Sequence, residues 1–195
     1  MILDRAYAEL QVAPDEGMLR GAGLHLEGAM ACMIELHSMS KSCGLAGWRM
    51  GFALGAPSMI EAMKRLKFNS DFGMFLPFQR VATEILTQLE FVSGPIRERY
   101  VHRITLAVEA FNALGWKVEA PEGGFFLWAQ LPGHVVPACD VAFTQSLLDE
   151  TGLLVTPGSA FGPADKGYVR IALVHNDGVL ACVFERLRTW FLNTR

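Results

Sequence analysis

The sequence predicts an α/β fold, in which apolar strand-like runs alternate with amphipathic helices. Ala31 to His37 is a continuous apolar run typical of a buried strand, and Gly47 to Gly55 follows it as a second one. Apolar residues then recur at helical spacing after Pro57, a residue that suits the start of a helix. Because 51% of the 195 residues are hydrophobic and 19% are charged, the chain can bury a substantial core.

The first half of the chain contains the elements of an α/β layer. Ile2-Leu3 is interpreted as the end of a strand, and residues 8–30 as loop with one short element. We expect helices over about 58–68 and 78–91. Gly94-Pro95 should separate the second of these from a longer helix that ends near Leu114, where Gly115 is a suitable stop.

The second half mixes strands and helices in a different order. Trp116–Glu119 alternates like a half-buried strand, and a turn with two glycines leads to a strongly apolar strand. Asn176 or Asp177 can cap a final helix that runs to about Leu192. The remaining expected elements are strand 125–131, helix 139–151, strand 153–155, loop 156–162 and strand 168–173.

These patterns divide the chain into two regions. Residues 1–95 are expected to form the C-terminal part of an α/β layer, and residues 96–195 a compact α+β domain that includes a long bridging helix. A domain seldom begins inside a strand, so the short apolar run at the start indicates a fragment of a longer protein.

Composition excludes several classes of protein. The net charge is −3 and there is no basic run, which argues against nucleic-acid binding. No apolar run reaches the length of a membrane span, and the N-terminus lacks the pattern of a signal peptide, so we expect a cytoplasmic protein without a membrane partner. The mean hydropathy of +0.27 favours an oligomer.

The cysteines and histidines do not predict a metal site. Their spacing includes neither CxxC nor a paired cysteine and histidine pattern, and the cysteines are interpreted as reduced thiols. His37 is of interest because it adjoins a turn with several hydroxyl groups. The four cysteines are Cys32, Cys43, Cys139 and Cys182.

That turn, Ser38 to Gly51, contains the strongest chemical signal in the sequence. It places Lys41 among small hydroxyl residues and glycines, with Arg49 eight positions further on and apolar flanks on both sides. Small neighbours let a ligand approach the backbone, and hydroxyls with an arginine can hold an anion. A lysine beside such a site can act as a Schiff-base nucleophile.

Several landmarks in order extend this signal along the chain. The pattern Ser38-x-Ser40-Lys41 followed by Gly47-x-Arg49-x-Gly51 resembles the signature of class I/II aminotransferases, the fold-type I enzymes that use pyridoxal 5′-phosphate. The other landmarks in family order are Asp4-x-x-Tyr7, Pro121-x-Gly123-Gly124-Phe125-Phe126, Pro157-Gly158-x-x-Phe161-Gly162 and Tyr168-x-Arg170-Ile171. The resemblance covers essentially the whole chain and implies a partial fold-type I large domain followed by the small domain.

The resemblance also implies roles for residues of the first region. Lys41 would form the Schiff base with the cofactor and later move the substrate proton, which requires an amine close to the ring. Asp4 would keep the pyridine nitrogen protonated, and Tyr7 would donate a hydrogen bond to the ring oxygen. The alternatives are a surface lysine, a carboxylate that caps a strand end and an ordinary half-buried tyrosine.

Anion binding is the second implied role. Ser38 and Arg49 would bind the cofactor phosphate, and Ser40 would either reach the phosphate or only hold the turn. Gly47 and Gly51 would serve packing and tight backbone geometry. Arg170, alone in an apolar strand, would clamp the substrate carboxylate, and its alternative is a structural ion pair.

The implied function is transfer of an amino group between an L-amino acid and a 2-oxo acid, in a homodimer. A different fold-type I activity, such as a C–S β-lyase or a synthase, would use the same residues, and a non-catalytic regulatory or dimerising module is a further alternative. Full-length members are roughly twice as long, and their N-terminal half supplies further cofactor-binding residues. We therefore expect the isolated chain to bind the cofactor weakly and to show little activity.

Overall fold

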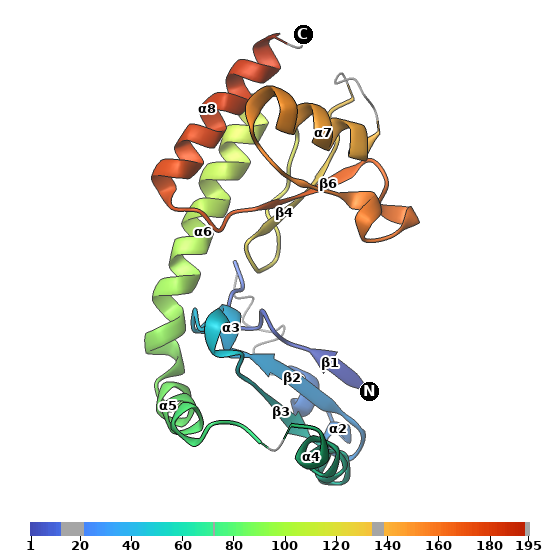
Figure 1. The fold of residues 1–195 in the computed structure, drawn as a ribbon, viewed down its shortest axis with the longest axis vertical. Coiled ribbons are helices and arrows are strands. Elements are labelled where there is room, and N and C mark those ends of the chain that lie inside the picture. Colours follow the sequence, from blue (N-terminus) through green and yellow to red (C-terminus); the bar gives the residue numbers. More distant parts are fainter. Residues whose placement is uncertain (13–21, 72, 134–138, 194–195) are drawn as a thin grey trace. The chain divides into compact units, whose positions relative to one another are not determined.

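The computed structural model describes residues 1–12, 22–71, 73–133 and 139–193, and it separates into two compact units. Unit 1 comprises Met1–Arg99 and unit 2 comprises Tyr100–Arg195 (Figure 1). The division falls within helix α6 (Leu89–Ala113). Part of the expected loop 8–30 lies outside the described residues.

Unit 1 is built on a three-stranded sheet with the order β1-β2-β3. Its strands are β1 (Ile2–Asp4), β2 (Ile34–Ser38) and β3 (Gly51–Gly55). Strand β1 pairs with β2 in parallel, so the carboxyl ends of both strands lie at one edge of the sheet. Strand β3 runs antiparallel to β2 and its first residue, Gly51, pairs with Ser38. The start of β3 therefore meets the same edge.

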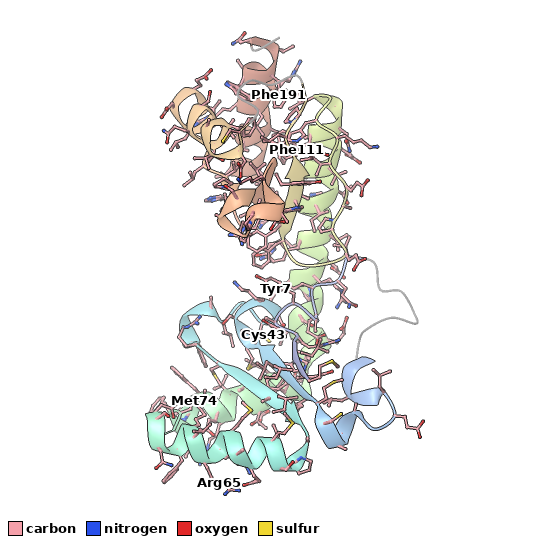
Figure 2. The ribbon with its side chains drawn as sticks, turned by 90° about the vertical axis from the view of Figure 1, so that its right-hand side faces the viewer. Tyr7, Cys43, Arg65, Met74, Phe111 and Phe191 are labelled. Atoms are coloured by element: carbon pink, nitrogen blue, oxygen red, sulfur yellow. The ribbon has the colours of Figure 1, made fainter. Side chains whose placement is uncertain are left out.

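Helices and a small buried cluster support this sheet. Met39, Cys43, Met50 and Ala82 form the cluster, and Cys43 is labelled in Figure 2. Met39 and Cys43 are four residues apart, which places both on one face of a helical turn. The helices of unit 1 are α1 (Ala22–His25), α2 (Ala29–Cys32), α3 (Met39–Ser42), η1 (Ala46–Trp48), α4 (Pro57–Asp71), α5 (Leu76–Thr87) and the first part of α6.

The expected break at Gly94-Pro95 is wrong. Helix α5 ends at Thr87 and α6 starts two residues later, with Pro95 inside it. A proline within a helix removes the hydrogen bond to the carbonyl four residues earlier, here that of Phe91. Phe91 is 80% exposed, so water can satisfy this carbonyl and the helix continues.

Unit 2 contains an antiparallel sheet with the order β4-β6-β5. Its buried face comprises Leu127, Ala129, Val169 and Ile171. Trp116 is fully buried and its ring contacts Phe111, Phe143 and Phe191 from three helices. The elements are β4 (Phe126–Gln130), α7 (Asp140–Thr151), β5 (Thr156–Pro157), η2 (Gly158–Ala160), η3 (Pro163–Asp165), β6 (Tyr168–Ala172) and α8 (Asp177–Asn193).

Most expected elements of unit 2 are confirmed. The expected strands 125–131 and 168–173 correspond to β4 and β6, and the expected helix 139–151 corresponds to α7. The Asn176 side-chain oxygen accepts a hydrogen bond from the backbone N–H of Val179 at 2.9 Å, so Asn176 caps α8.

Two expected strands of unit 2 are wrong. Trp116–Glu119 forms no strand because the Asn112 side chain occupies the polar groups that a strand would pair: its oxygen accepts from Val118 N at 3.1 Å and its amide donates to Val118 O at 3.2 Å. Leu153–Val155 also lies outside any strand, and only the next two residues pair with β6.

Asp140 is a buried carboxylate that holds the loop before β6. It is 3% exposed, and Oδ2 accepts a hydrogen bond from the backbone N–H of Ser159 at 2.6 Å. Hydrogen bonds from Ser159, the backbone N–H first, lower the pKa of Asp140 below its ordinary value. The loop 158–161 is therefore fixed by an ionised acid from α7.

Replacing Asp140 by alanine should reduce the free energy of unfolding by about 1.5–3 kcal/mol at neutral pH, because a charge-assisted hydrogen bond is lost. A carboxyl whose pKa is lowered on folding stabilises the protein above its unfolded pKa and loses this effect as the pH falls through its folded pKa. The difference between D140A and the unmodified chain, measured by urea unfolding, should therefore shrink in acid.

The matched control for this experiment is Asp149→Ala, which removes an exposed acid of the same helix. Its carboxylate only accepts from Gln145 at 2.8 Å on the helix surface. We expect a change within about 0.5 kcal/mol. A D140A deficit that stays constant from neutral to acid pH would contradict the role of the ionised carboxylate.

Candidate functional site

The sheet of unit 1 gathers most of the candidate residues at one edge. Asp4 is the last residue of β1 and Ser38 the last of β2, and these strands are parallel. Arg49 lies two residues before β3, whose first residue pairs with Ser38. Ligands in open α/β sheets commonly bind beyond the carboxyl ends of strands. The topology thus brings the candidate residues to an edge of the kind that binds ligands.

Lys41 lies on the short helix α3, which starts directly after β2. The Ser38 hydroxyl caps this helix by accepting from the backbone N–H of Ser40 at 3.3 Å. The backbone N–H of Met39 donates to Met50 O at 3.2 Å, which closes the turn between β2 and β3. The Met39 side chain is 2% exposed, so its burial holds the turn against the core of unit 1.

The amine of Lys41 points toward the segment that follows β1. Its Nζ lies 5.8 Å from the centroid of the Tyr7 ring. Lys41 and Tyr7 are both half-buried, whereas Asp4 is exposed and its Oδ1 accepts from the backbone N–H of Ala6 at 3.0 Å. Asp4 therefore caps the end of β1 in this structure.

Arg49 has an unusual backbone conformation. Among the described residues, Arg49 is the only non-glycine residue with a positive φ, at φ 55° and ψ 42°. Such a conformation costs an ordinary residue about 1–2 kcal/mol. The guanidinium donates to Ala46 O at 3.2 Å and forms no ion pair within the described part of the chain. An exposed cation is thus held at the site edge by a strained turn.

His37 has a structural role. Its Nε2 lies 3.0 Å from Glu35 Oε2, and its ring stacks on Phe52 at a centroid distance of 4.8 Å. Glu35 is buried, and its other oxygen accepts from the backbone N–H of Leu24 at 3.2 Å. Glu35 therefore connects His37 on β2 to Leu24 on α1.

In unit 2, Arg170 lies on the sheet face opposite the buried core. The sheet register places it directly across from Trp128, while its neighbours Val169 and Ile171 are buried. Its Cζ lies 4.4 Å from the centroid of the Phe126 ring and 4.6 Å from that of Phe161. Within the described residues its guanidinium forms no ion pair or hydrogen bond, which argues against a structural ion pair.

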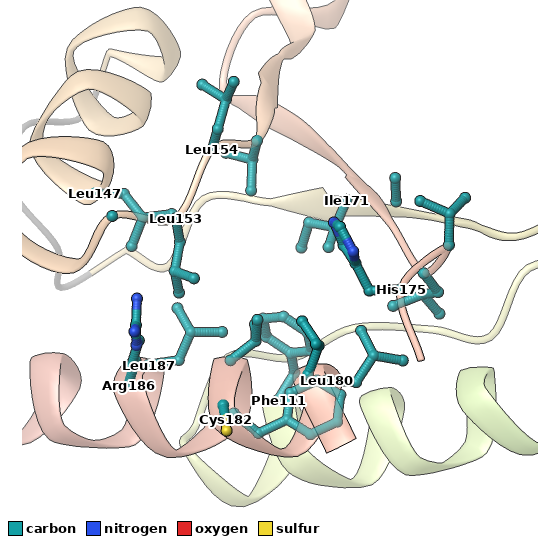
Figure 3. A pocket seen from close by; sticks show the side chains of 18 of the residues that line it. Phe111, Leu147, Leu153, Leu154, Ile171, His175, Leu180, Cys182, Arg186 and Leu187 are labelled. Carbon is teal, nitrogen blue, oxygen red and sulfur yellow. The ribbon is translucent and has the colours of Figure 1, made fainter. Parts of the chain in front are cut away.

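A cavity of about 710 Å³ in unit 2 lies on the other side of the sheet from Arg170. Figure 3 shows its lining, which includes Phe111, Leu154, Ile171 and Leu187. The walls are predominantly apolar, with His175 and Arg186 also on the lining. None of the seven candidate residues lines it, so we separate it from the candidate site.

Sequence reasoning missed three features of the site. Phe126 and Phe161 occur in quoted motifs but received no role, although both rings contact Arg170. The buried Asp140 was also missed. The position of Asp140 before an apolar helical stripe was the signal that could have identified it.

Gly51 has the expected close approach, since an added Cβ would lie 2.6 Å from His37 O, whereas a Cβ on Gly47 would meet nothing within 4 Å.

Comparison with known proteins identifies the family. The model of the family "Aminotransferase class I and II" matches residues 1–187, so the chain belongs to this family. Its members are pyridoxal-phosphate-dependent enzymes that act on amino acids and oxo acids and commonly form dimers. The fold is that of the C-terminal part of a fold-type I aminotransferase.

Two curated relatives illustrate the match. The LL-diaminopimelate aminotransferase of Moorella thermoacetica is 35% identical over 185 residues, which cover 95% of this chain and 46% of the relative. That of Natranaerobius thermophilus is 36% identical over 188 residues, covering 96% of this chain and 47% of the relative. The chain thus spans about half the length of the curated relatives it matches.

Solved structures agree with this assignment. Substrate-bound BacF from Bacillus subtilis superposes with a TM-score of 0.88 at 30% identity, covering 97% of this chain and 47% of that chain. A probable N-succinyldiaminopimelate aminotransferase from Thermus thermophilus gives a TM-score of 0.83 at 32% identity, covering 96% of this chain and 49% of that chain.

None of the helices in the described residues is long and apolar enough to cross a membrane. The same residues contain no group of three or more His, Cys, Asp and Glu side chains that could hold a metal ion.

Gly51→Ala should destabilise unit 1, because the new Cβ would meet the carbonyl of His37 at 2.6 Å, in the β2–β3 pairing that ends at Ser38. We expect a loss of about 1–3 kcal/mol in the free energy of unfolding, measured by urea titration. Gly47→Ala is the matched control and should change it by less than about 0.5 kcal/mol. Equal effects of the two substitutions would contradict the steric argument.

Proposed function

We propose that this chain is the lysine-bearing part of a pyridoxal-phosphate-dependent aminotransferase that transfers an amino group between an L-amino acid and a 2-oxo acid. The observation that supports the proposal is the topology of unit 1, which brings an amine, a hydroxyl, a guanidinium and a carboxylate to one sheet edge. In this proposal residues 1–95 are part of the cofactor-binding domain and residues 96–195 form the small domain.

The donor set of unit 1 fits pyridoxal phosphate. Lys41 would hold the cofactor covalently through its amine. Ser38 and Arg49 would bind its phosphate, since Arg49 is an exposed guanidinium two residues before β3, whose first residue pairs with Ser38. The Ser40 hydroxyl would either reach the phosphate or only hold the turn, in which the Ser40 backbone N–H donates to the Ser38 hydroxyl. Asp4 would face the pyridine nitrogen and Tyr7 the ring oxygen.

When bound, the cofactor supplies an electron sink for the bonds at the substrate α-carbon. The protein's task is then to orient the substrate and to move one proton. Lys41 would be the base for the α-carbon proton once the amine of the substrate has replaced it on the cofactor, since the freed lysine amine beside the ring can accept the proton and return it. Arg170 would orient the substrate by binding its carboxylate with a planar pair of N–H donors.

The names of the relatives favour transamination over the alternatives of a C–S β-lyase, a synthase or a regulatory module. They also make a diaminopimelate-type amino donor the first to test, with aspartate and aromatic amino acids next. We further propose a homodimer in the cytoplasm, in keeping with the family.

Lys41 should react selectively with the cofactor. We would incubate the chain with pyridoxal phosphate, make the adduct permanent with borohydride and map it by peptide mass spectrometry. Labelling of Lys41 should saturate at a cofactor concentration at least about 10-fold lower than labelling of exposed lysines, because Lys41 is the lysine that adjoins the proposed phosphate site.

Lys64 and Lys67 are internal controls, since both are exposed on α4. Arg49→Lys should raise the cofactor concentration required at Lys41 about 10-fold through the loss of the bidentate contact, and leave Lys64 unchanged. Indiscriminate labelling of all three lysines would overturn the proposed site. In a complete enzyme, Lys41→Ala should reduce turnover by about 100- to 10,000-fold.

A further inference from the structure

Arg170 is held by aromatic rings instead of by an acid. Its Cζ lies 4.4 Å from the centroid of Phe126 and 4.6 Å from that of Phe161, both within cation–π range. No carboxylate or carbonyl binds its guanidinium within the described residues. Its position is therefore restricted while its N–H donors stay unused.

The two rings come from different elements. Phe126 is on β4, where it pairs with Ala172, so it is the diagonal neighbour of Arg170 on the same sheet face. Phe161 follows η2 and packs edge-to-face against Trp128, at a centroid distance of 5.4 Å. Trp128 is directly opposite Arg170 in the register and also stacks on Tyr168.

The loop that carries Phe161 is itself fixed. Gly158 fits so closely that an added Cβ would lie 2.1 Å from Asp165 O. The backbone N–H of Phe161 donates to Gly158 O at 2.8 Å, and Asp140 binds the backbone N–H of Ser159 at 2.6 Å. The ring of Phe161 is thus presented by a rigid loop, although the residue is 47% exposed.

We propose that Phe126 and Phe161 are positioning residues that hold the Arg170 guanidinium ready for a carboxylate. This inference rests on the proposed function, in which Arg170 binds the substrate carboxylate. An acidic partner would also fix the side chain, but it would compete with the substrate for the same donors. Aromatic faces attract the cation through their quadrupoles and leave the in-plane N–H groups available.

The inference can be tested on the full chain without the cofactor. The chain is labelled with ¹⁵N and titrated with propionate, a carboxylate that lacks an amino group. The Nε–Hε signal of Arg170, identified by its absence in R170K, reports binding. Phe161→Leu and Phe126→Leu should each weaken propionate binding by about 2- to 10-fold, because each loses one cation–π contact.

Tyrosine variants separate this role from a merely structural one. F161Y and F126Y keep the aromatic face and should bind propionate within about twofold of the unmodified chain. Backbone signals of β6 confirm that each variant is folded, and if F126L is not, the exposed Phe161 carries the test. Phe68→Leu, a change at an exposed aromatic residue of unit 1, is the control and should have no effect.

Three results would overturn the inference: leucine variants that bind propionate as well as the unmodified chain, tyrosine variants that bind as poorly as the leucine variants, and an Arg170 signal that does not respond to propionate. The first two leave the proposed function untouched. The third also removes the proposed role of Arg170, but selective cofactor labelling of Lys41 would still stand.

Discussion

The parallel pairing of β1 with β2 is the constraint on which the candidate site depends. Because the two strands run in the same direction, the residues that follow them emerge at one edge, although 34 positions separate Asp4 from Ser38. The antiparallel β3 then returns to this edge and brings Arg49 with it. Neither α3 nor the strained turn at Arg49 would form a common site without this alignment.

The segment from Ser38 to Gly51, which contains Lys41, is also held by buried apolar residues. Met39, Cys43 and Met50 are buried, and burial raises the pKa of the Cys43 thiol. Cys43 is thus a neutral packing residue. Apolar contacts hold one face of the turn, and the hydrogen bond between Met39 N–H and Met50 O connects its ends.

Elements with a strong local signal were predictable from the sequence. The apolar runs of β4 and β6 and the capped helix α8 depend on periodicity and on a single cap, so they were found within a residue or two. The errors arose where a distant or unusual partner decides the structure. The Asn112 side chain replaces a strand partner for Val118, and water access lets α6 continue through Pro95.

The candidate site was predictable to a different extent. The order and spacing of the motifs along the chain were enough to select Lys41, Arg49 and Arg170 as candidate site residues. It could not show that Asp4 caps its own strand end, that Arg49 is strained or that two rings contact Arg170. These features depend on pairing register and loop closure, which a single sequence does not specify.

Arg170 differs from Arg97 and Arg103 in the groups that contact its guanidinium. Arg97 and Arg103 each have an acidic partner, Glu90 and Asp177 respectively, as a buried or half-buried cation normally requires. Arg170, which is also half-buried, has none within the described residues and instead contacts the faces of two aromatic rings, which leave its N–H donors unused. Because a half-buried cation without an acidic partner is costly, this arrangement supports the proposal that Arg170 binds an anionic ligand.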